Sequence, residues 1–570
     1  MNESSRNPSW FADRVFFNGT VVTLDAAATI ASSIAVCGER IAAVGGDDAI
    51  ARCIGPSTVV TDLRGRTLMP GMIDGHAHMD REGLKGILPS LGGIRSIGEL
   101  IARLKEIAAG VPAGQWVVTM PLGDPPHYIA TADLFQEGRL PNRHDLDQAS
   151  RDHPIFIRSA WGYWSRTLPL VCVANSRALE IAGVGRHTAA PTPKVSIERD
   201  ASGEPTGVFL ESDHMPIAEF TLFRAAPNFS FDERVAALAE SMRSYNAAGT
   251  TSVFEGHGVA TETIAAYQRL RETNRQSVRA QLVFSPGWSA LSTPEVAKIV
   301  ASWGRWLAGR GLGDAWLRVA GVYTEIDDAP EGRLRARCAP QTGWAGFNYD
   351  AGLPRTAVRE LMIEAARLGM RVCGIWDNLL ELYAEVDRVV PIAGQRWVLG
   401  HQSILGAESI ARIRDLGIVL GAHTNAHIHH RASEFLARIG RERENEICPL
   451  RSIIDAGIRV SLGTDNVPVS MFHPVWQSVE RIDRKTGHVI APMQKISREE
   501  ALRCATVDGA WLCFEEDEKG SLEPGKLADL IVLADNPLTV DAARLRDLVP
   551  ELTMVGGKVV HERTSDRPDR

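Results

Sequence analysis

The chain has 570 residues, of which 44% are hydrophobic and 23% are charged, and its formal net charge at pH 7 is −8. This composition is ordinary for a globular protein, and the length exceeds what one hydrophobic core usually supports, so we expect at least two domains. The negative charge argues against nucleic acid or an anionic membrane as the main partner. A membrane span is not indicated either, because no run of 18 apolar residues occurs.

The eight cysteines are scattered without CxxC spacing, so neither a zinc ribbon nor a disulfide framework is indicated. The first residues, MNESSR, do not resemble a secretion signal, which has a basic segment followed by an apolar one. We therefore expect a cytoplasmic protein with reduced thiols.

Both ends of the chain are rich in β-strand signals. Short alternating hydrophobic segments flanked by turn residues occur at 15–24, 33–46, 528–533 and 553–560. Neither end is large enough to close a core alone. We therefore expect residues 1–66 and 521–570 to pair into one composite β-sandwich domain.

The region between the two ends alternates strand-like and helical patterns. Eight apolar runs are separated by amphipathic stretches: 67–76, 250–255, 279–284, 317–323, 371–375, 397–401, 418–423 and 459–465. This alternation is typical of parallel strands with crossover helices, and eight such units predict an α/β fold of the TIM (β/α)8 barrel type over residues 67–520.

The end of the first run carries two histidines in the pattern His76-Ala-His78. Alternate side chains of a strand point the same way, so both imidazoles are expected to reach one point, where they could grip a metal ion. A simple pair of hydrogen-bonded histidines at a strand end is the alternative.

Further polar residues occur at or just past the other strand ends, and the chemistry of a TIM barrel lies at the carboxyl ends of its strands. They are Glu255, His257, Glu325, Cys373, Asp377, His401, His423 and Asp465. Three more histidines follow His423 closely, and we interpret them as loop or helix-start residues.

Residues 81–245 separate the first barrel strand from the second, which is too long for a structureless loop. Strand-like pieces at 116–120 and 154–158 predict an inserted subdomain over the barrel mouth. Four aromatic residues are candidates to line a substrate pocket: Trp161, Tyr163 and Trp164 of the insertion and Trp376 after the fifth strand. For the insertion's aromatics, an internal core is an equal alternative.

Five stretches of the chain together resemble the amidohydrolase superfamily. They are PGMIDGHAH at 70–78, VANSRALEIAG at 173–183, GHQ at 400–402, LGTD at 462–465 and GSLEPGKLADLIV at 520–532. The chain is most similar to the branch that includes N-substituted formamide deformylases and other metal-dependent hydrolases. The resemblance implies a TIM barrel with a β-sandwich built from both termini.

The resemblance also implies roles for four residues. His76 and His78 would be metal ligands, and Asp465 would both bind the metal and take a proton from the attacking water. His401 would be the sixth-strand histidine that stabilises a developing oxyanion. The alternatives are a turn residue for Asp465 and a core histidine for His401.

The chain departs from the family pattern at two positions. Tyr323 stands where the family commonly has a lysine that bridges two metals, and Cys373 stands where the fifth strand commonly offers a histidine. We therefore expect one divalent metal, with zinc favoured over manganese, cobalt or iron. Five residues compete to supply a further ligand: Glu255, His257, Glu325, Cys373 and His423.

The predicted function is metal-dependent hydrolysis of an amide-type carbon–nitrogen bond in a small, partly aromatic or N-acyl or N-formyl substrate. A metal-dependent lyase or decarboxylase on the same scaffold and a non-catalytic binding protein are the alternatives. The expected partner is a small molecule, with no nucleic acid and no membrane. The oligomeric state stays open, with a homodimer as one alternative.

Overall fold

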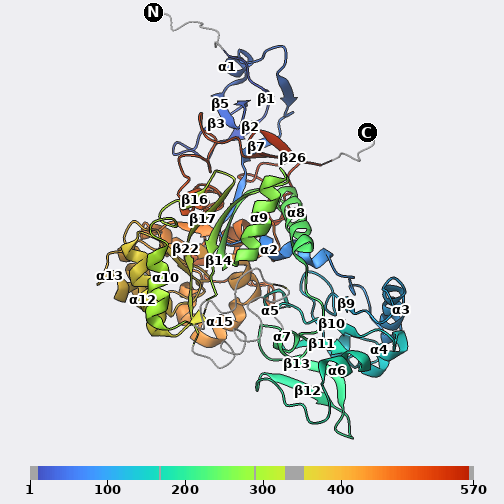
Figure 1. Cartoon of the computed structure of the whole chain (residues 1–570). Helices are drawn as coiled ribbons and strands as arrows, with labels where there is room; N and C mark the ends of the chain where they lie inside the picture. Colours follow the sequence, from blue (N-terminus) through green and yellow to red (C-terminus); the bar gives the residue numbers. More distant parts are fainter. Residues whose placement is uncertain (1–9, 166–167, 288–290, 328–343, 345–351, 564–570) are drawn as a thin grey trace, which may run out of the picture. The chain divides into compact units, whose positions relative to one another are not determined.

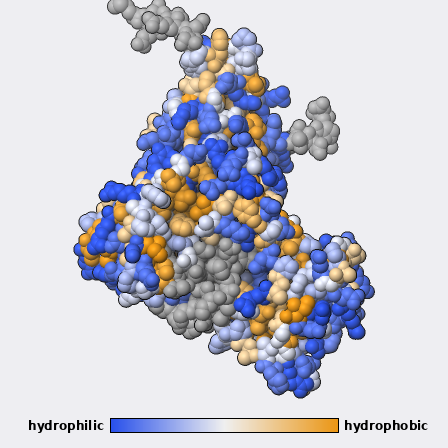
Figure 2. Space-filling view, viewed as in Figure 1, coloured by the Kyte–Doolittle hydropathy of each residue, from blue (hydrophilic) through white to orange (hydrophobic). Residues whose placement is uncertain are grey.

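The computed structural model of the chain describes residues 10–165, 168–287, 291–327, 344 and 352–563 (Figure 1). The chain divides into two compact units. The first unit comprises Met1–Met79, Ala239–Asp327 and Ala351–Arg570, and the second comprises Asp80–Leu238 and Asp328–Asp350. Among the described residues, we find no helix that is both long and apolar enough to cross a bilayer. The face shown in Figure 2 mixes hydrophilic residues with smaller hydrophobic patches.

The first unit contains eight parallel strands in chain order around one sheet. They are β8 (Met72–Asp74), β14 (Thr250–Val259), β15 (Arg279–Phe284), β17 (Leu317–Tyr323), β20 (Val372–Gly374), β21 (Val398–Leu399), β22 (Val419–Ala422) and β23 (Val460–Leu462). A short strand, β16 (Leu312–Gly313), pairs antiparallel with β17. Backbone hydrogen bonds also join the first and eighth strand regions, from Gly75 N to Leu462 O at 2.9 Å and from Asp465 N to His76 O at 3.1 Å. The predicted barrel is confirmed.

Helices connect successive barrel strands, as the crossover of parallel strands requires. They include α9 (Thr261–Glu272), α10 (Thr293–Ser302), α12 (Arg355–Arg367), α13 (Leu379–Asp387), α14 (Ala407–Leu416) and α16 (Leu450–Asp455). In α14, helical spacing puts Ile410, Ile413 and Leu416 on one buried face, and the helix ends at Gly417 with φ 66°, which glycine adopts without strain.

The predicted first strand, residues 67–76, is two strands in the structure. β7 (Thr67–Pro70) pairs with strands of another sheet, and only β8 belongs to the barrel. The break falls at Gly71, where an added Cβ would lie 2.2 Å from a side-chain carbon of Thr251. A buried apolar run looks the same in one sheet as in two, so periodicity alone missed this break.

Strands from the first and last parts of the described chain form two further sheets of the first unit, and β18 (Glu325–Ile326) pairs with β19 (Gly352–Leu353) in a small separate sheet. The six-stranded sheet has the order β26 (Lys558–Glu562), β25 (Leu552–Val555), β24 (Leu530–Leu533), β7, β2 (Thr20–Val22) and β3 (Ile30–Ala31), and the four-stranded sheet has the order β5 (Arg40–Gly45), β4 (Ser33–Cys37), β1 (Arg14–Phe17) and β6 (Val59–Asp62). One hydrophobic cluster includes Phe16 and Ile34 of the second sheet and Leu530 and Met554 of the first. The exact boundaries of the terminal domain stay a prediction.

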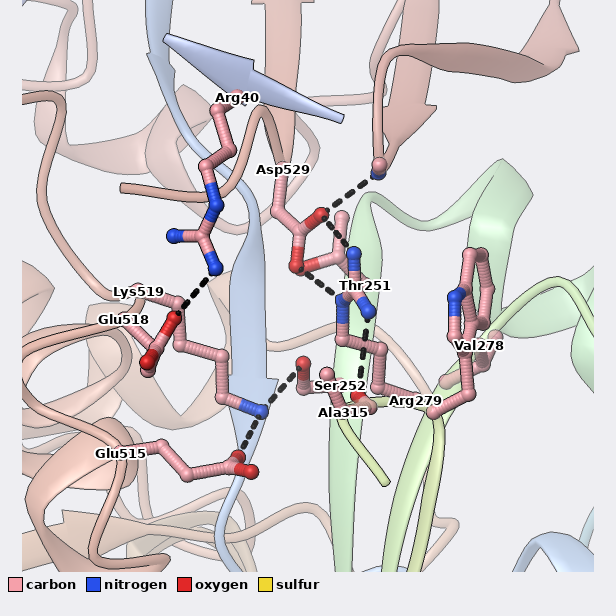
Figure 3. Close-up of polar contacts among 12 residues, drawn as sticks. Arg40, Thr251, Ser252, Val278, Arg279, Ala315, Glu515, Glu518, Lys519 and Asp529 are labelled. Atoms are coloured by element: carbon pink, nitrogen blue, oxygen red, sulfur yellow. Dashed lines mark hydrogen bonds and ion pairs between the residues drawn. The ribbon is translucent and has the colours of Figure 1, made fainter. Parts of the chain in front are cut away.

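A buried ion pair ties the C-terminal segment to the start of a barrel strand (Figure 3). Arg279 donates from Nε and Nη2 to both carboxylate oxygens of Asp529, at 2.8 and 3.1 Å, and both side chains are almost fully buried. Nearby, Lys519 Nζ contacts Glu515 at 2.7 Å and donates to Ser252 Oγ at 3.0 Å. Such two-point pairing of Arg279 and Asp529 fixes the orientation of the two segments.

The second unit is built on a five-stranded sheet with the order β12 (Val195–Arg199), β13 (Pro205–Glu211), β11 (Leu170–Ala174), β10 (Ile155–Ile157) and β9 (Val117–Thr119). The two strand-like pieces expected in the insertion correspond to β9 and β10. The helices of the unit include α3 (Ile97–Ala109), α4 (Arg143–Ala149), α6 (Ser176–Ala182) and α7 (Ile217–Thr221). Its core includes Leu100, Leu104, Ile155 and Val173.

Glu211 is a fully buried carboxyl group at the end of β13. It accepts hydrogen bonds from Ser159 Oγ at 2.6 Å and from Ala218 N at 3.1 Å. Burial raises its pKa from 4.5 to about 8, and the nearby carboxylate of Glu219 adds to this, against the opposing effect of the hydrogen bonds.

This raised pKa predicts that the folded chain loses stability as pH rises. The folded state binds the Glu211 proton more tightly than the unfolded state, so the free energy of unfolding falls by about 1.4 kcal/mol per pH unit between about 4.5 and about 8. In Glu211→Gln, we expect this loss between pH 6 and pH 8 to disappear. Denaturant unfolding at pH 6 and at pH 8 measures the free energy of unfolding of each variant.

The exposed Glu198 on β12 is the matched position, and Glu198→Gln should keep the wild-type dependence on pH. If Glu211→Gln loses as much stability between pH 6 and pH 8 as the wild type, then Glu211 is ionised in the fold and the argument from burial is wrong.

Candidate metal centre

Histidine and aspartate side chains gather at the carboxyl ends of the barrel strands. His76 and His78 follow β8, His401 follows β21, His423 follows β22 and Asp465 follows β23. Each is placed by the last residues of a short buried strand, so the side chains converge on one end of the barrel. The structure therefore brings together the four residues that the sequence predicts to bind metal or act on substrate.

His76 lies at the centre of this cluster. The centroid of its ring is 4.4 Å from that of His423, 4.7 Å from that of His401 and 5.0 Å from that of His78. Ligand atoms of His76, His401 and His423 all lie within 4.8 Å of one another, and the same holds for His76, His78 and His257. Imidazole nitrogens at such spacing suit zinc or another transition metal.

Asp465 contributes the carboxylate of the cluster. Its Oδ1 lies 3.0 Å from Nε2 of His78, and both side chains are nearly buried. Burial alone would raise the pKa of Asp465, but the hydrogen bond from His78 and the charge interactions with His401 and His78 lower it well below 3.8. Asp465 is therefore ionised at neutral pH and can act as a ligand or as a base.

His423 provides the test of whether these residues fit a metal. Its side chain is 1% exposed, and neither Nδ1 nor Nε2 has a hydrogen-bond partner among the described residues. A buried imidazole without partners is unfavourable unless something else binds its nitrogen. A metal ion held in the cluster would be a partner for one of these two nitrogens, so the donor set fits a metal.

The protonation state of His76 and His423 also suits metal binding. Burial lowers the pKa of His76 well below 6.5, and the neighbouring imidazoles of His401 and His78 lower it further. Burial and the same kind of neighbours lower the pKa of His423 well below 6.5. Both rings are neutral at physiological pH, which is the form that binds metal.

Backbone geometry at the site is unusual for residues other than glycine. His401, Asp465 and Asn466 have φ values of 51°, 55° and 63°, in the left-handed region. Asparagine and aspartate tolerate this region better than most residues, whereas histidine there needs support from its surroundings. The strand ends thus hold their ligands in turns that the fold imposes.

Close packing explains one glycine of the LGTD stretch. An added Cβ on Gly463 would lie 2.7 Å from Cβ of His76 and 3.2 Å from Nε2 of His423. Any other residue would displace the two imidazoles. Gly463 is therefore part of the site, although it carries no side chain.

Sequence reasoning missed the residues that hold the ligands in place. Buried Asp74 accepts hydrogen bonds from the backbone N–H groups of His76 and Thr464, both at 3.0 Å, and from the hydroxyl of Thr464. Asn466 accepts from His78 N at 2.9 Å and donates to His78 O, and the hydroxyl of Tyr245 donates to Asn466 Oδ1. The spacing of Asp74 from His76 was the only sequence signal for this network.

The hydrogen bond from Tyr245 to Asn466 predicts that Tyr245 influences metal binding through the position of His78. In Tyr245→Phe, Asn466 loses one of its bonds and holds the backbone of His78 less firmly. We expect metal affinity to fall by about tenfold, as for other residues that orient metal ligands, and this can be measured by competition with a chelator.

Tyr383→Phe is the matched control, because Tyr383 is also a buried tyrosine that donates one hydrogen bond, to Val398 O at 3.0 Å. If both variants change metal affinity equally, the effect reflects lost stability rather than the position of His78.

The other candidate residues occupy distinct places around the cluster. Glu255 is buried and accepts from Met79 N at 2.9 Å and from the Tyr267 hydroxyl at 2.6 Å. His257 is 7% exposed, and its ring centroid lies 5.5 Å from that of His78. Glu255 thus supports the backbone after His78, and His257 lies beside the histidine cluster.

Glu325 and Cys373 belong to none of the candidate metal groups among the described residues. Glu325 begins β18 (Glu325–Ile326) and accepts from the Tyr323 hydroxyl at 3.0 Å and from Trp376 Nε1 at 3.3 Å. Cys373 is fully buried in an apolar cluster, and burial raises the pKa of its thiol to about 12. The structure thus places Cys373 in the apolar core of the barrel and not among the candidate ligands.

The predicted pocket aromatics divide between the two units. Trp376 of the first unit is 39% exposed, and its ring centroid lies 6.2 Å from that of His401. Trp161 and Trp164 of the second unit are each 1% exposed, so their rings pack inside that unit. The side chain of Tyr163 lies outside the described part of the chain. Among the described candidates for the pocket, Trp376 is thus the one that lies near a histidine of the candidate metal centre.

His427 is a further residue whose position the sequence did not predict. It lies in a π-helix, Asn425–His430, is 3% exposed, and its ring centroid is 6.1 Å from that of His401. Single π-helical turns occur often at functional sites. The histidine-rich run was interpreted as loop or helix start, and it had no feature that predicts this turn.

The fold and the cluster together define a hydrolase of the metal-dependent TIM-barrel class. The sequence profile described as the amidohydrolase family matches residues 59–561. The chain therefore belongs to the amidohydrolase family, and the predicted enzyme class, an amidohydrolase that acts on carbon–nitrogen bonds other than peptide bonds, is confirmed at the level of the family.

Individual relatives agree with this assignment over nearly the whole chain. The chain is 29% identical to the N-substituted formamide deformylase of Arthrobacter pascens over 97% of this chain and 99% of that one. It is 26% identical to the protein LONG AFTER FAR-RED 3 of Arabidopsis thaliana, over 92% and 88%. An uncharacterized metal-dependent hydrolase of Pyrococcus horikoshii shares the fold, with a TM-score of 0.66, 21% identity and coverage of 93% and 99%.

Proposed function

We propose that this amidohydrolase uses one divalent metal to hydrolyse an amide-type carbon–nitrogen bond in a small N-acyl or N-formyl compound. The observation that carries the proposal is the convergence of neutral imidazoles around His76 beside an ionised Asp465. The buried nitrogens of His423 have no hydrogen-bond partner among the described residues.

His76, His78 and Asp465 are the residues that we propose hold the metal, with His423 as the further ligand. Zinc is the metal we favour, because imidazole nitrogens and a carboxylate oxygen are its usual ligands. A divalent metal held there supplies Lewis-acid chemistry, which polarises a carbonyl group and makes water easier to deprotonate.

Asp465 is placed to move the proton during hydrolysis. Its low pKa keeps the carboxylate free to accept a proton from the attacking water, and the same group can then deliver that proton to the leaving nitrogen. The water oxygen forms a bond to the carbonyl carbon, the carbon–nitrogen bond breaks, and the products are a carboxylic acid and an amine.

His401 is the group that we propose stabilises the negative charge on the carbonyl oxygen. Its Nε2 lies 3.2 Å from Nε2 of His76, so it reaches the space beside the proposed ligands. A hydrogen-bond donor fixed at that point stabilises an oxyanion that develops during attack. The ring is half-buried and follows a left-handed backbone turn at His401.

The proposed substrate class rests on similarity to the formamide deformylase together with the aromatic ring of Trp376 near His401. N-formyl and N-acyl amines with a benzyl or phenyl group on nitrogen suit a site with one aromatic wall. The test incubates metal-supplemented protein with a panel of such amides and of cyclic amides, in water enriched in oxygen-18. We expect amine release and one oxygen-18 atom in the acid product.

Each alternative gives a different result in the same experiment. Product without oxygen-18 and with loss of carbon dioxide indicates a lyase. No turnover of any amide by fully metal-loaded protein contradicts the proposal and favours a binding protein.

A further inference from the structure

The second unit contains an open cavity of about 210 Å³ that the proposed hydrolysis does not use. All the described residues that line it belong to that unit. Its walls are mainly apolar and include Leu88, Ile107, Trp116, Val118 and Phe229. An apolar cavity of about 150 Å³ is already large enough to bind benzene, so this one has room for a substituted aromatic ring.

One charged side chain in the lining, Arg158, is almost completely buried. It is 1% exposed, and it uses Nε, at 3.0 Å, and Nη2 to bind both carboxylate oxygens of Glu219. The third nitrogen, Nη1, is buried and has no hydrogen-bond partner among the described residues. A buried donor without an acceptor is unfavourable, so Nη1 favours a ligand that brings an oxygen.

Two aromatic rings cover the guanidinium of Arg158. The distance from Cζ of Arg158 to the ring centroid is 4.9 Å for Phe229 and 4.4 Å for Trp344. Trp344 is anchored, because its indole Nε1 donates to Ser159 O at 3.0 Å. Phe229 has no polar group to anchor it and also lines the cavity. Arg158 and Phe229 both line the cavity, so the guanidinium lies at the cavity wall.

The charges around the cavity select for an uncharged ligand. Glu219 already balances the positive charge of Arg158, so the free N–H attracts a neutral carbonyl oxygen without needing an anion. The acidic residue in the described lining, Glu233, is exposed and carries a negative charge that repels anions.

We propose that this cavity is a second ligand site, which binds a small, uncharged aromatic molecule with one carbonyl oxygen. The aromatic ring occupies the apolar walls, and the carbonyl oxygen accepts a hydrogen bond from Nη1 of Arg158. The proposal does not depend on the reaction proposed for the metal centre, and either can fail without the other.

The probe for this site is 4-bromoacetophenone, an uncharged aromatic ketone that cannot be hydrolysed. Crystals of the full chain grown with the probe should show an anomalous bromine peak among the cavity residues. Absence of a peak there, or a peak at the metal centre alone, overturns the proposal. In solution, 4-bromobenzoate has the same ring and a negative charge, and we expect it to bind at least about tenfold more weakly by calorimetry.

Two substitutions on helix α3 form a matched pair. Ile107 and Ile101 are both half-buried and both pack against the same hydrophobic core, but only Ile107 lines the cavity. We expect Ile107→Trp to fill the cavity and weaken binding of the ketone by at least about tenfold, and Ile101→Trp to leave it unchanged. Thermal unfolding of both variants shows that they fold.

Equal binding to Ile107→Trp and wild type contradicts the assignment of the site. If 4-bromobenzoate binds as tightly as the ketone, the cavity is a ligand site for anions and the proposed ligand class is wrong.

Discussion

Asp465→Asn is expected to lower turnover by about 10³-fold or more, because it removes the general base and weakens metal binding in one step. The substitution keeps the shape of the side chain. Asparagine also tolerates the left-handed backbone at φ 55°, so the fold should stay close to that of the wild type. The measurement is kcat for the amide identified by the substrate panel, with metal content determined in parallel.

The matched control for this prediction is Asp508→Asn. Asp508 is a half-buried aspartate of α19 (Val507–Leu512) that pairs with Arg459 at 3.3 Å, and it has no place in the metal cluster. It should keep wild-type turnover. Near-normal turnover by Asp465→Asn shows that another group takes the proton, and the assignment of Asp465 then fails.

His76→Ala is expected to abolish stable metal binding. His76 belongs to both histidine groups that could hold a metal within the described part of the chain, so its removal breaks each of them. Residues that only orient a ligand change metal affinity by about 10- to 100-fold, so loss of a central ligand should exceed this range. Metal content after dialysis should fall from about one equivalent per chain to less than about a tenth.

His561→Ala provides the control, because His561 lies on β26 in another sheet. It should retain the wild-type metal content. Full metal occupancy in His76→Ala places the metal elsewhere and contradicts the proposed centre. If His76→Ala loses both metal and cooperative unfolding, the metal also stabilises the barrel, which agrees with the proposal.

Periodicity was sufficient to predict the barrel, because its strands are buried on both faces and give uninterrupted apolar runs. It could not show that residues 67–76 serve two sheets. That division depends on the close approach of Gly71 to Thr251, a contact between segments far apart in the sequence.

The candidate site was predictable where a ligand ends a strand. His76, His78, His401 and Asp465 all follow apolar runs, and the structure places them together. Their proposed roles as ligands, base and oxyanion donor stay predictions.

The residues that orient these ligands were not predictable in the same way. Tyr245 lies on a helix more than 160 residues from His78, and only the fold brings it to Asn466. No local pattern in a sequence encodes such a contact. The cavity beside Arg158 was hidden for the same reason, since its lining comes from several separate segments of the insertion.

The most direct test of the metal centre is anomalous scattering from crystals of metal-supplemented protein, with data collected on both sides of the absorption edge of the metal. We predict one strong peak within about 2.0–2.3 Å of nitrogen atoms of His76 and His78 and of a carboxylate oxygen of Asp465. A metal-loaded crystal without a peak among these three residues contradicts the proposed centre.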